Sequence, residues 1–142
     1  MQRIDRELNI GLDSARAMQI TLAWAMDQSG ATAGLVGPVD EGEVKIQAST
    51  GFTEPVPGVE NGIFHLEAYN LLTIVESGEP ARTALSSDSL HLLPDGKYRI
   101  VLPIRRESST IGLVYLESEK IDPITDEKFS FLQRLCDHAA VA

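Results

Sequence analysis

Two neighbouring apolar runs near the end of the chain constrain the fold more than any other feature. The first, Tyr98 to Arg105, is rich in β-branched and aromatic residues, and the second extends from Ile111 to Glu117. Each run has the length and composition of a β-strand. The polar residues Glu107 to Thr110 lie between them. The pair therefore predicts a largely buried antiparallel hairpin with a four-residue connection.

A helix is predicted directly after this hairpin. Thr125 stands where an N-cap is expected, and Asp126 and Glu127 follow in the first turn, where negative charge meets the positive end of the helix dipole. An apolar stripe with spacings of three and four comes next, formed by Phe129, Leu132, Cys136 and Ala139 and widened by Phe131, Leu135 and Ala140. The end of the chain thus reads as hairpin, turn and terminal helix.

The residues of this segment resemble the C-terminal half of a GAF domain. The matching stretches are Pro103-Ile104-Arg105, Ile111-Gly112-Leu113-Val114, Ile124-Thr125-Asp126-Glu127, Phe131-Leu132 and Leu135-Cys136-Asp137-His138-Ala139-Ala140-Val141-Ala142. The family usually has an aromatic residue in place of Ile124 and an alanine in place of Cys136. The first half of the chain matches by its order of elements only. The resemblance implies a sensory or regulatory module of signalling proteins.

The rest of the chain supplies the other elements of an α+β fold. The expected elements are a helix over 2–27, strands over 31–39 and 43–48, a loop over 51–62, a helix over 64–77, an edge strand over 79–85 and a polar loop over 86–97. The polar side chains of 43–48 place that strand at a sheet edge. We expect a central antiparallel sheet of about five to six strands. The N- and C-terminal helices pack on one face, and loops and a short helix cover the other, as in GAF and PAS domains.

Length and charge narrow the possible partners. With 142 residues the chain is expected to form a single GAF-like domain, 1–142, and both ends read as cut from a longer protein that carries other signalling domains. The net charge of −9 argues against binding nucleic acid or a membrane surface. One cysteine, a charged N-terminus and the lack of a long apolar run indicate the cytoplasm.

The first helix carries an apolar seam with nearly heptad spacing. Its members are Ile4, Leu8, Gly11, Ala15, Met18, Leu22 and Ala25. Two interpretations stay open: the seam packs inside this domain, or Ile4, Leu8, Ala15, Met18 and Leu22 pair with the helix of a second copy in a homodimer.

Residues with catalytic or metal-binding chemistry are scarce. The sequence has no nucleophile elbow, phosphate-binding loop or dinucleotide fingerprint, and His65, His91 and His138 lack partners at metal-ligand spacing. Cys136 lies late in a helix on an apolar stripe, which predicts a buried, inert thiol. Arg105 and Arg106 are adjacent on a strand and are expected to point to opposite faces. We therefore predict no catalytic residue, no metal site and no cofactor.

The family resemblance sharpens these exclusions. Bilin-carrying GAF domains attach their chromophore through a pocket cysteine, and GAF-type methionine-sulfoxide reductases use several cysteines, whereas this chain has one outside the pocket region. The Asn/Lys/Phe/Asp/Glu signature of cyclic-nucleotide-binding members is not recognisable here. The resemblance thus implies a non-enzymatic module.

A ligand site is expected on the loop-covered face of the sheet. The candidate pocket residues are Phe64, His65, Tyr69, His91, Leu92 and Tyr98, which lie on or beside the covering segments and offer aromatic surface with a few polar groups. The leading hypothesis is a module that senses an unidentified small molecule and relays its state through the terminal helices. The alternative is a ligand-free homodimerisation module with a filled pocket.

Overall fold

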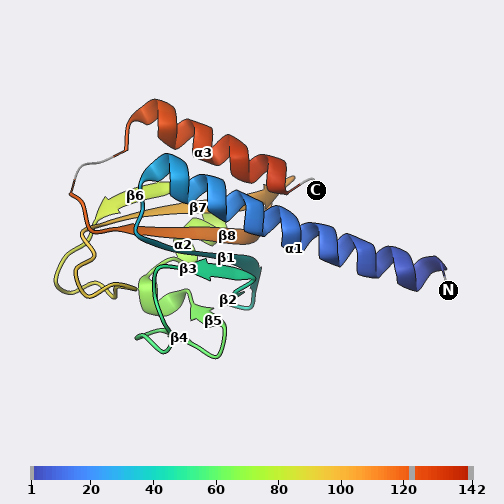
Figure 1. The fold of residues 1–142 in the computed structure, drawn as a ribbon, viewed down its shortest axis with the longest axis horizontal. Coiled ribbons are helices and arrows are strands. Elements are labelled where there is room, and N and C mark those ends of the chain that lie inside the picture. The colour runs from blue at the N-terminus through green and yellow to red at the C-terminus, as the bar shows by residue number, and fades with distance from the viewer. Residues whose placement is uncertain (1, 122–123, 141–142) are drawn as a thin grey trace.

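The computed structural model describes the backbone of residues 2–121 and 124–140 and the side chains of 14–121 and 124–140 (Figure 1). The helices are α1 (Gln2–Ser29), the 3-10 helix η1 (Glu67–Tyr69), α2 (Leu72–Ser77) and α3 (Asp126–Ala139). The strands are β1 (Ala33–Asp40), β2 (Glu43–Lys45), β3 (Ala48–Thr50), β4 (Val59–Glu60), β5 (Ile63–His65), β6 (Ala81–Ala84), β7 (Tyr98–Arg106) and β8 (Ser109–Ser118). The predicted α+β class is confirmed.

The described strands form one antiparallel sheet in the order β4-β5-β2-β1-β8-β7-β6, and β3 also pairs with β1. It has eight strands rather than the expected five to six: β4 and β5 arise where a loop and a helix were predicted, and β3 begins at Ala48, where the predicted strand 43–48 ends. β6 lies at an edge, as predicted. The edge position predicted for 43–48 is wrong, since β2 is paired on both sides, with β1 and with β5.

The β7–β8 hairpin forms where the sequence predicts it, but with a shorter connection. Ser109 and Thr110 already pair with Arg106 and Arg105, which leaves two residues, Glu107 and Ser108, in the turn. Glu107 adopts a φ of 58°, in the left-handed region that a tight turn requires. The register shifts between Ile104, which pairs with Gly112, and Arg105, which pairs with Thr110, so β8 carries a bulge at Ile111 just after the hairpin turn.

The helix predicted over 64–77 is confirmed only in its last part, α2. Phe64 lies in β5, where it pairs with Val44 on one side and Val59 on the other. The chain then makes the single turn of η1, and Asn70 takes a φ of 58°, which a helix cannot continue. Strand pairing on both sides of Phe64 thus overrides the helical spacing of its neighbours.

The sheet separates two layers. α1 and α3 pack side by side on one face, as predicted, while α2, η1 and the connecting loops lie on the other (Figure 1). Alternation along the strands divides the core accordingly: Ile100 and Leu102 face the helices α1 and α3, whereas Val101 faces the loops. We call these two sides the helix face and the loop face.

α1 is longer than the body of the domain. Its C-terminal half packs on the helix face, where Met18, Leu22 and Ala25 are buried in the core, and its N-terminal half extends past the C-terminal end of α3 (Figure 1). Met18 and Leu22, two members of the proposed dimer seam, are therefore used inside this domain. The side chains of Ile4 and Leu8 lie outside the described residues.

Candidate functional site

The loop face, where the sequence places the ligand site, is filled by three aromatic side chains. Phe64 of β5, Tyr69 of η1 and Tyr115 of β8 are all buried. Their ring centroids lie 4.5 Å (Phe64 to Tyr69), 5.2 Å (Phe64 to Tyr115) and 5.6 Å (Tyr69 to Tyr115) apart. These are the separations of directly packed rings. We call these three residues the aromatic cluster.

Aliphatic side chains from strands and loops surround the aromatic cluster. The buried members are Leu35, Val44, Val59, Leu66, Leu71, Leu92, Val101 and Leu113. Tyr69 is also fixed by its hydroxyl, which donates a hydrogen bond of 2.8 Å to the carbonyl oxygen of Pro57 in the covering loop. The rings thus occupy the space between sheet and loops.

A buried carboxylate holds the second covering loop against the sheet. Glu117 of β8 is fully buried. It accepts hydrogen bonds from the backbone N–H groups of Leu92 (2.9 Å) and Leu93 (2.6 Å) and from the hydroxyl of Tyr115 (2.9 Å). Gly96 lies so close that a Cβ there would be 2.5 Å from the carboxylate. We call Glu117 with these loop contacts the loop anchor.

Burial and the nearby Glu117 raise the pKa values of the two tyrosines in the aromatic cluster. Desolvation raises the pKa of the Tyr115 hydroxyl far above its usual value, and the neighbouring charge of Glu117 raises it further. The same two causes, in the same order, raise the pKa of Tyr69. Both phenols are therefore neutral donors at physiological pH.

The structure brings only part of the predicted pocket together. Phe64, Tyr69 and Leu92 meet in the core of the loop face. His65 is half-buried on β5, and His91 is half-buried with its Nε2 3.1 Å from the carbonyl oxygen of Ser86.

Tyr98 lies on the other side of the sheet. It belongs to the core of the helix face with Ile100 and Leu102, because alternate residues of β7 share a face. A small hollow of about 20 Å³ beside Tyr98, Ile100 and Leu116 has room for roughly one water molecule.

Sequence reasoning missed Tyr115 and Glu117, which complete the site. Both lie in the run Ile111 to Glu117, whose pattern predicts only a buried strand. The sequence holds two signals for them. Tyr115 and Glu117 are two residues apart on a strand and so share a face. A carboxylate at the end of a buried strand also needs hydrogen-bond donors.

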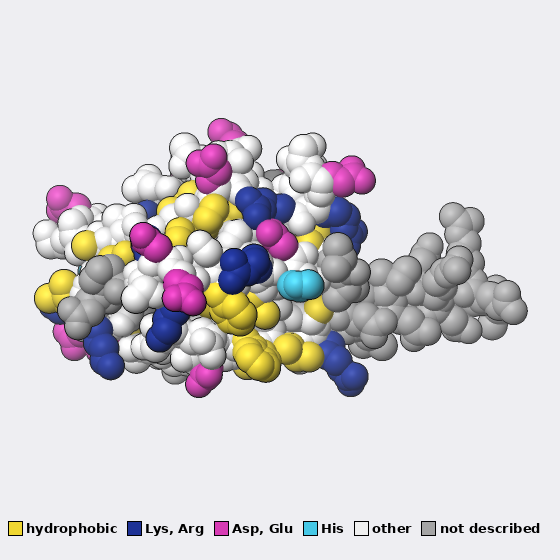
Figure 2. All heavy atoms as spheres, turned by 90° about the horizontal axis from the view of Figure 1, so that it is seen from above, with side chains coloured by type: hydrophobic (Ala, Val, Ile, Leu, Met, Phe, Trp, Pro, Cys, Tyr) yellow, Lys and Arg dark blue, Asp and Glu magenta, His cyan; other side chains and the backbone are white. Residues whose placement is uncertain are grey.

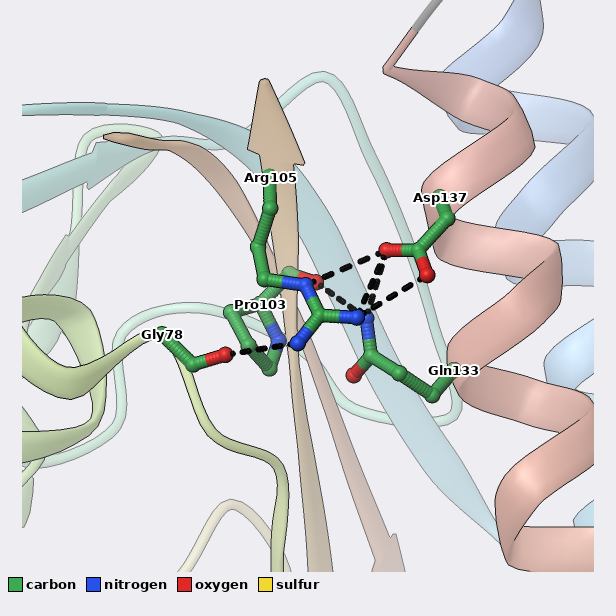
Figure 3. Close-up of polar contacts among 5 residues, drawn as sticks. All are labelled: Gly78, Pro103, Arg105, Gln133 and Asp137. Carbon is green, nitrogen blue, oxygen red and sulfur yellow. Dashed lines mark hydrogen bonds and ion pairs between the residues drawn. The ribbon is translucent and has the colours of Figure 1, made fainter. Parts of the chain in front are cut away.

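A second polar cluster connects β7 to α3 (Figure 3). The guanidinium of Arg105 binds both carboxylate oxygens of Asp137, with Nη2 2.9 Å from Oδ2 and 3.0 Å from Oδ1. Gln133 donates from Nε2 to the carbonyl oxygen of Pro103 and to Asp137 Oδ1, at 3.0 Å each. Arg106 donates to the carbonyl oxygen of Ala140. The guanidinium groups of Arg105 and Arg106 therefore both contact α3, although the two residues are adjacent on β7.

Cys136 is buried in the helix-face core, as predicted, and burial raises the pKa of its thiol well above the usual range. Among the residues whose side chains are described, no group of three or more His, Cys, Asp or Glu side chains is arranged to hold a metal ion.

The helix face exposes apolar side chains of α1. Figure 2 views this face, where hydrophobic side chains form a patch among charged ones. Ile20 is 51% and Trp24 52% exposed, on the side of α1 opposite the buried Met18 and Leu22. We call Ile20 and Trp24 the exposed α1 stripe.

An antiparallel sheet between a helix pair and a loop-covered face is the architecture that the sequence resemblance predicts. A model of the GAF domain family matches residues 13–142, and the chain belongs to this family. No protein with a curated description matches the sequence significantly. Within the described residues, no helix is long and apolar enough to cross a membrane.

Solved structures share the fold at low sequence identity. The GAF domain of a phosphoenolpyruvate-protein phosphotransferase from Coxiella burnetii is 19% identical, with a TM-score of 0.74 over 99% of this chain and 88% of that chain. The GAF-B domain of DevS from Mycobacterium smegmatis is 23% identical, with a TM-score of 0.68 over 90% of each chain. A type II free methionine-R-sulfoxide reductase from Thermoplasma acidophilum is 17% identical, with a TM-score of 0.73 over 90% of each chain. The shared fold thus occurs in an enzyme as well as in GAF domains.

Proposed function

We propose that this GAF domain acts as a ligand-free homodimerisation module of a cytoplasmic, multidomain signalling protein, and that it relays conformational change through α1 and α3. The observation that supports this function is the aromatic cluster. A ligand on the loop face would first have to displace Phe64, Tyr69 or Tyr115, and exposing one such side chain costs about 1.5–3 kcal/mol. That cost would be subtracted from the affinity of any ligand.

The exposed α1 stripe is the surface we propose for the second copy. Met18, Leu22 and Ala25 already face the domain core, so Ile20 and Trp24 are left for an intermolecular contact. The part of α1 whose backbone extends past α3 lengthens this surface, and most helical stability comes from packing one face of a helix against a neighbour.

Charge allows two copies of this surface to meet. The chain carries a net charge of −9, but the segment Ser14 to Ser29 contains only Arg16 and Asp27 as charged residues and is neutral overall. Two acidic molecules that associate through this segment avoid most of the like-charge repulsion that other surfaces would impose.

Sedimentation and fluorescence test the dimer. We expect the chain to sediment as a dimer at about 50 μM, and the double variant Ile20→Glu/Trp24→Glu to sediment as a folded monomer, because charges in an apolar contact are costly to desolvate. Trp24 is the only tryptophan of the chain, so its emission should shift to shorter wavelength as concentration rises. Ile20→Glu should abolish that shift.

Ile121→Glu is the matched control, since Ile121 is an exposed apolar residue that follows β8 rather than lying on α1. It should leave the dimer intact. A monomeric parent chain, or a dimer that survives both α1 substitutions, would contradict the proposal.

Small-molecule sensing is the second candidate, favoured by the surroundings of His65. Its side chain borders two solvent-open hollows, of about 660 Å³ beside Glu67 and Leu72 and of about 380 Å³ beside Pro57 and Val59. A thermal-shift screen against nucleotides and metabolites tests this candidate, with His65→Ala as the matched variant. A compound that raises the unfolding midpoint of the parent but not of the variant would support sensing at His65.

A further inference from the structure

Arg105 lies on β7 at an open edge of the sheet, where a side chain can pass from the loop face to the helix face. The pairing of β6 with β7 ends at Ala81 and Val101, so no strand of the described residues pairs with the outer side of β7 near Arg105. The segment from Gly78 to Ala81 leads from α2 into β6 along this edge. A side chain here can reach elements of both faces.

The Arg105 guanidinium makes contacts in both directions (Figure 3). Toward the loop face, Nη1 donates a hydrogen bond of 3.1 Å to the carbonyl oxygen of Gly78. Toward the helix face, Nε and Nη2 bind Asp137 at 2.9–3.2 Å. The planar fork of arginine permits this, because its donors point in fixed, divergent directions.

Both partners sit near the ends of helices. Gly78 is the C-cap of α2, with a φ of 69° and its N–H bonded to the carbonyl oxygen of Ile74 at 2.8 Å. Asp137 lies in the last turn of α3. α2 packs on β7 and β8 from the loop face, and α3 packs on α1 and β7 from the helix face. Arg105 is thus a direct polar connection between two helices on opposite faces.

We propose that Arg105 couples the C-terminal end of α2 to the C-terminal turn of α3. When the α2 cap moves, the guanidinium loses or shifts its Gly78 contact, and the bidentate geometry at Asp137 changes with it. Conversely, a displacement of α3 changes the hydrogen bond from Arg105 to the α2 cap, since coupling between two sites is reciprocal. This inference extends the proposed relay, because a movement of α2 on the loop face would reach α3 on the helix face. It does not require that the chain dimerise.

A mutant cycle followed by amide hydrogen exchange tests this coupling. Gly78→Ala strains the α2 cap, because its φ is positive, while the added Cβ would meet Arg105 Cδ at an ordinary 3.5 Å. We expect Gly78→Ala to accelerate exchange in the last turns of α3 several-fold relative to β8, whose amides report global stability. In an Arg105→Gln background, Gly78→Ala should no longer change α3.

Arg106→Gln is the matched control. Arg106 also holds α3, through the carbonyl oxygen of Ala140, but is not bonded to Gly78. In this background the response of α3 to Gly78→Ala should persist. Arg105→Lys, which keeps the charge but not the fork, serves if Arg105→Gln fails to fold, and it should also suppress the response.

Two results would overturn the coupling. One is an α3 that does not respond to Gly78→Ala in the parent chain, and the other is an equal response in the presence and absence of Arg105. Both outcomes are read within one molecule, so they are distinguishable from a failure of the dimer, which sedimentation measures separately.

Discussion

At the scale of single residues, the loss of the Glu117 carboxylate should strongly lower the stability of the fold. Glu117→Ala leaves two buried N–H groups, of Leu92 and Leu93, and the Tyr115 hydroxyl without their acceptor. An unsatisfied buried donor costs about 1–3 kcal/mol, so we expect the free energy of unfolding to fall by roughly 3–5 kcal/mol. Urea denaturation measures this loss.

Two further variants locate the cause. Glu117→Gln keeps the shape but presents an amide N–H₂ to one of the loop donors, and should cost about 1–3 kcal/mol. Glu119→Gln, an exposed acid two residues on, should change stability by less than about 0.5 kcal/mol. Similar losses at both positions would show that charge, rather than the hydrogen bonds of the loop anchor, is responsible.

The tyrosines of the aromatic cluster predict a loss of stability at alkaline pH. The pKa values of Tyr69 and Tyr115 are raised in the folded chain, so their stabilising contribution is complete below the usual value of about 10 and falls as pH rises above it. We expect these phenols to ionise only as the chain unfolds. Parallel pH titrations of tyrosinate absorbance and of circular dichroism check this, and ionisation of both phenols in the fully folded chain would contradict it.

The sequence predicts the residues of the site only where the local pattern determines their position. Phe64, Tyr69 and Leu92 lie on segments that the sequence places over the sheet, and they meet in the core of the loop face. Tyr98 was placed on the same face, but its face depends on the register of β7, which sequence spacing alone does not set. Tyr115 was hidden within a strand whose two faces are both buried, so alternation gave no signal there.

At the scale of elements, the beginning of α3 offers a direct test of capping. The Thr125 hydroxyl accepts a hydrogen bond of 3.2 Å from the N–H of Lys128, as the sequence predicts for an N-cap. Thr125→Ala should lower the free energy of unfolding by about 1 kcal/mol. Ser130→Ala, at an exposed position inside the same helix, should instead be neutral or slightly stabilising. Thermal unfolding of both variants decides whether the cap or general helix propensity matters.

Elements stabilised by their own sequence were predicted well, and elements stabilised by neighbours were not. α3 has its cap, its apolar stripe and its charged first turn within one segment. β5, by contrast, exists because β2 and β4 flank it, and its three residues are too few for a periodic signal. The bulge at Ile111 has the same origin, since it arises from how β7 and β8 pair near a tight turn.

At the scale of the whole molecule, the two layers were predictable because hydrophobic patterning determines them. Terminal helices with apolar stripes and strands with buried runs leave few alternatives to helices on one face of a sheet. The filled loop face was not predictable, because it depends on the aromatic cluster meeting across three elements and on the loop anchor closing over it. The same distinction separates the family, which sequence reveals, from the state of its pocket.

The extension of α1 past the domain body leads to the last prediction. The buried core described by the structure begins at Met18, and the family match begins at residue 13. Removing residues 1–12 should therefore shift the thermal midpoint of the monomer by less than about 3 °C, which corresponds to ~1 kcal/mol.

The dimer should respond differently. If Ile4 and Leu8 pair with a second copy, their removal should weaken dimerisation at least about tenfold, while Ile20 and Trp24 keep residual association. Sedimentation of the shortened chain over a concentration series measures this. A large loss of monomer stability would place the first turns of α1 in the fold itself, and an unchanged dimer would confine the interface to the exposed α1 stripe.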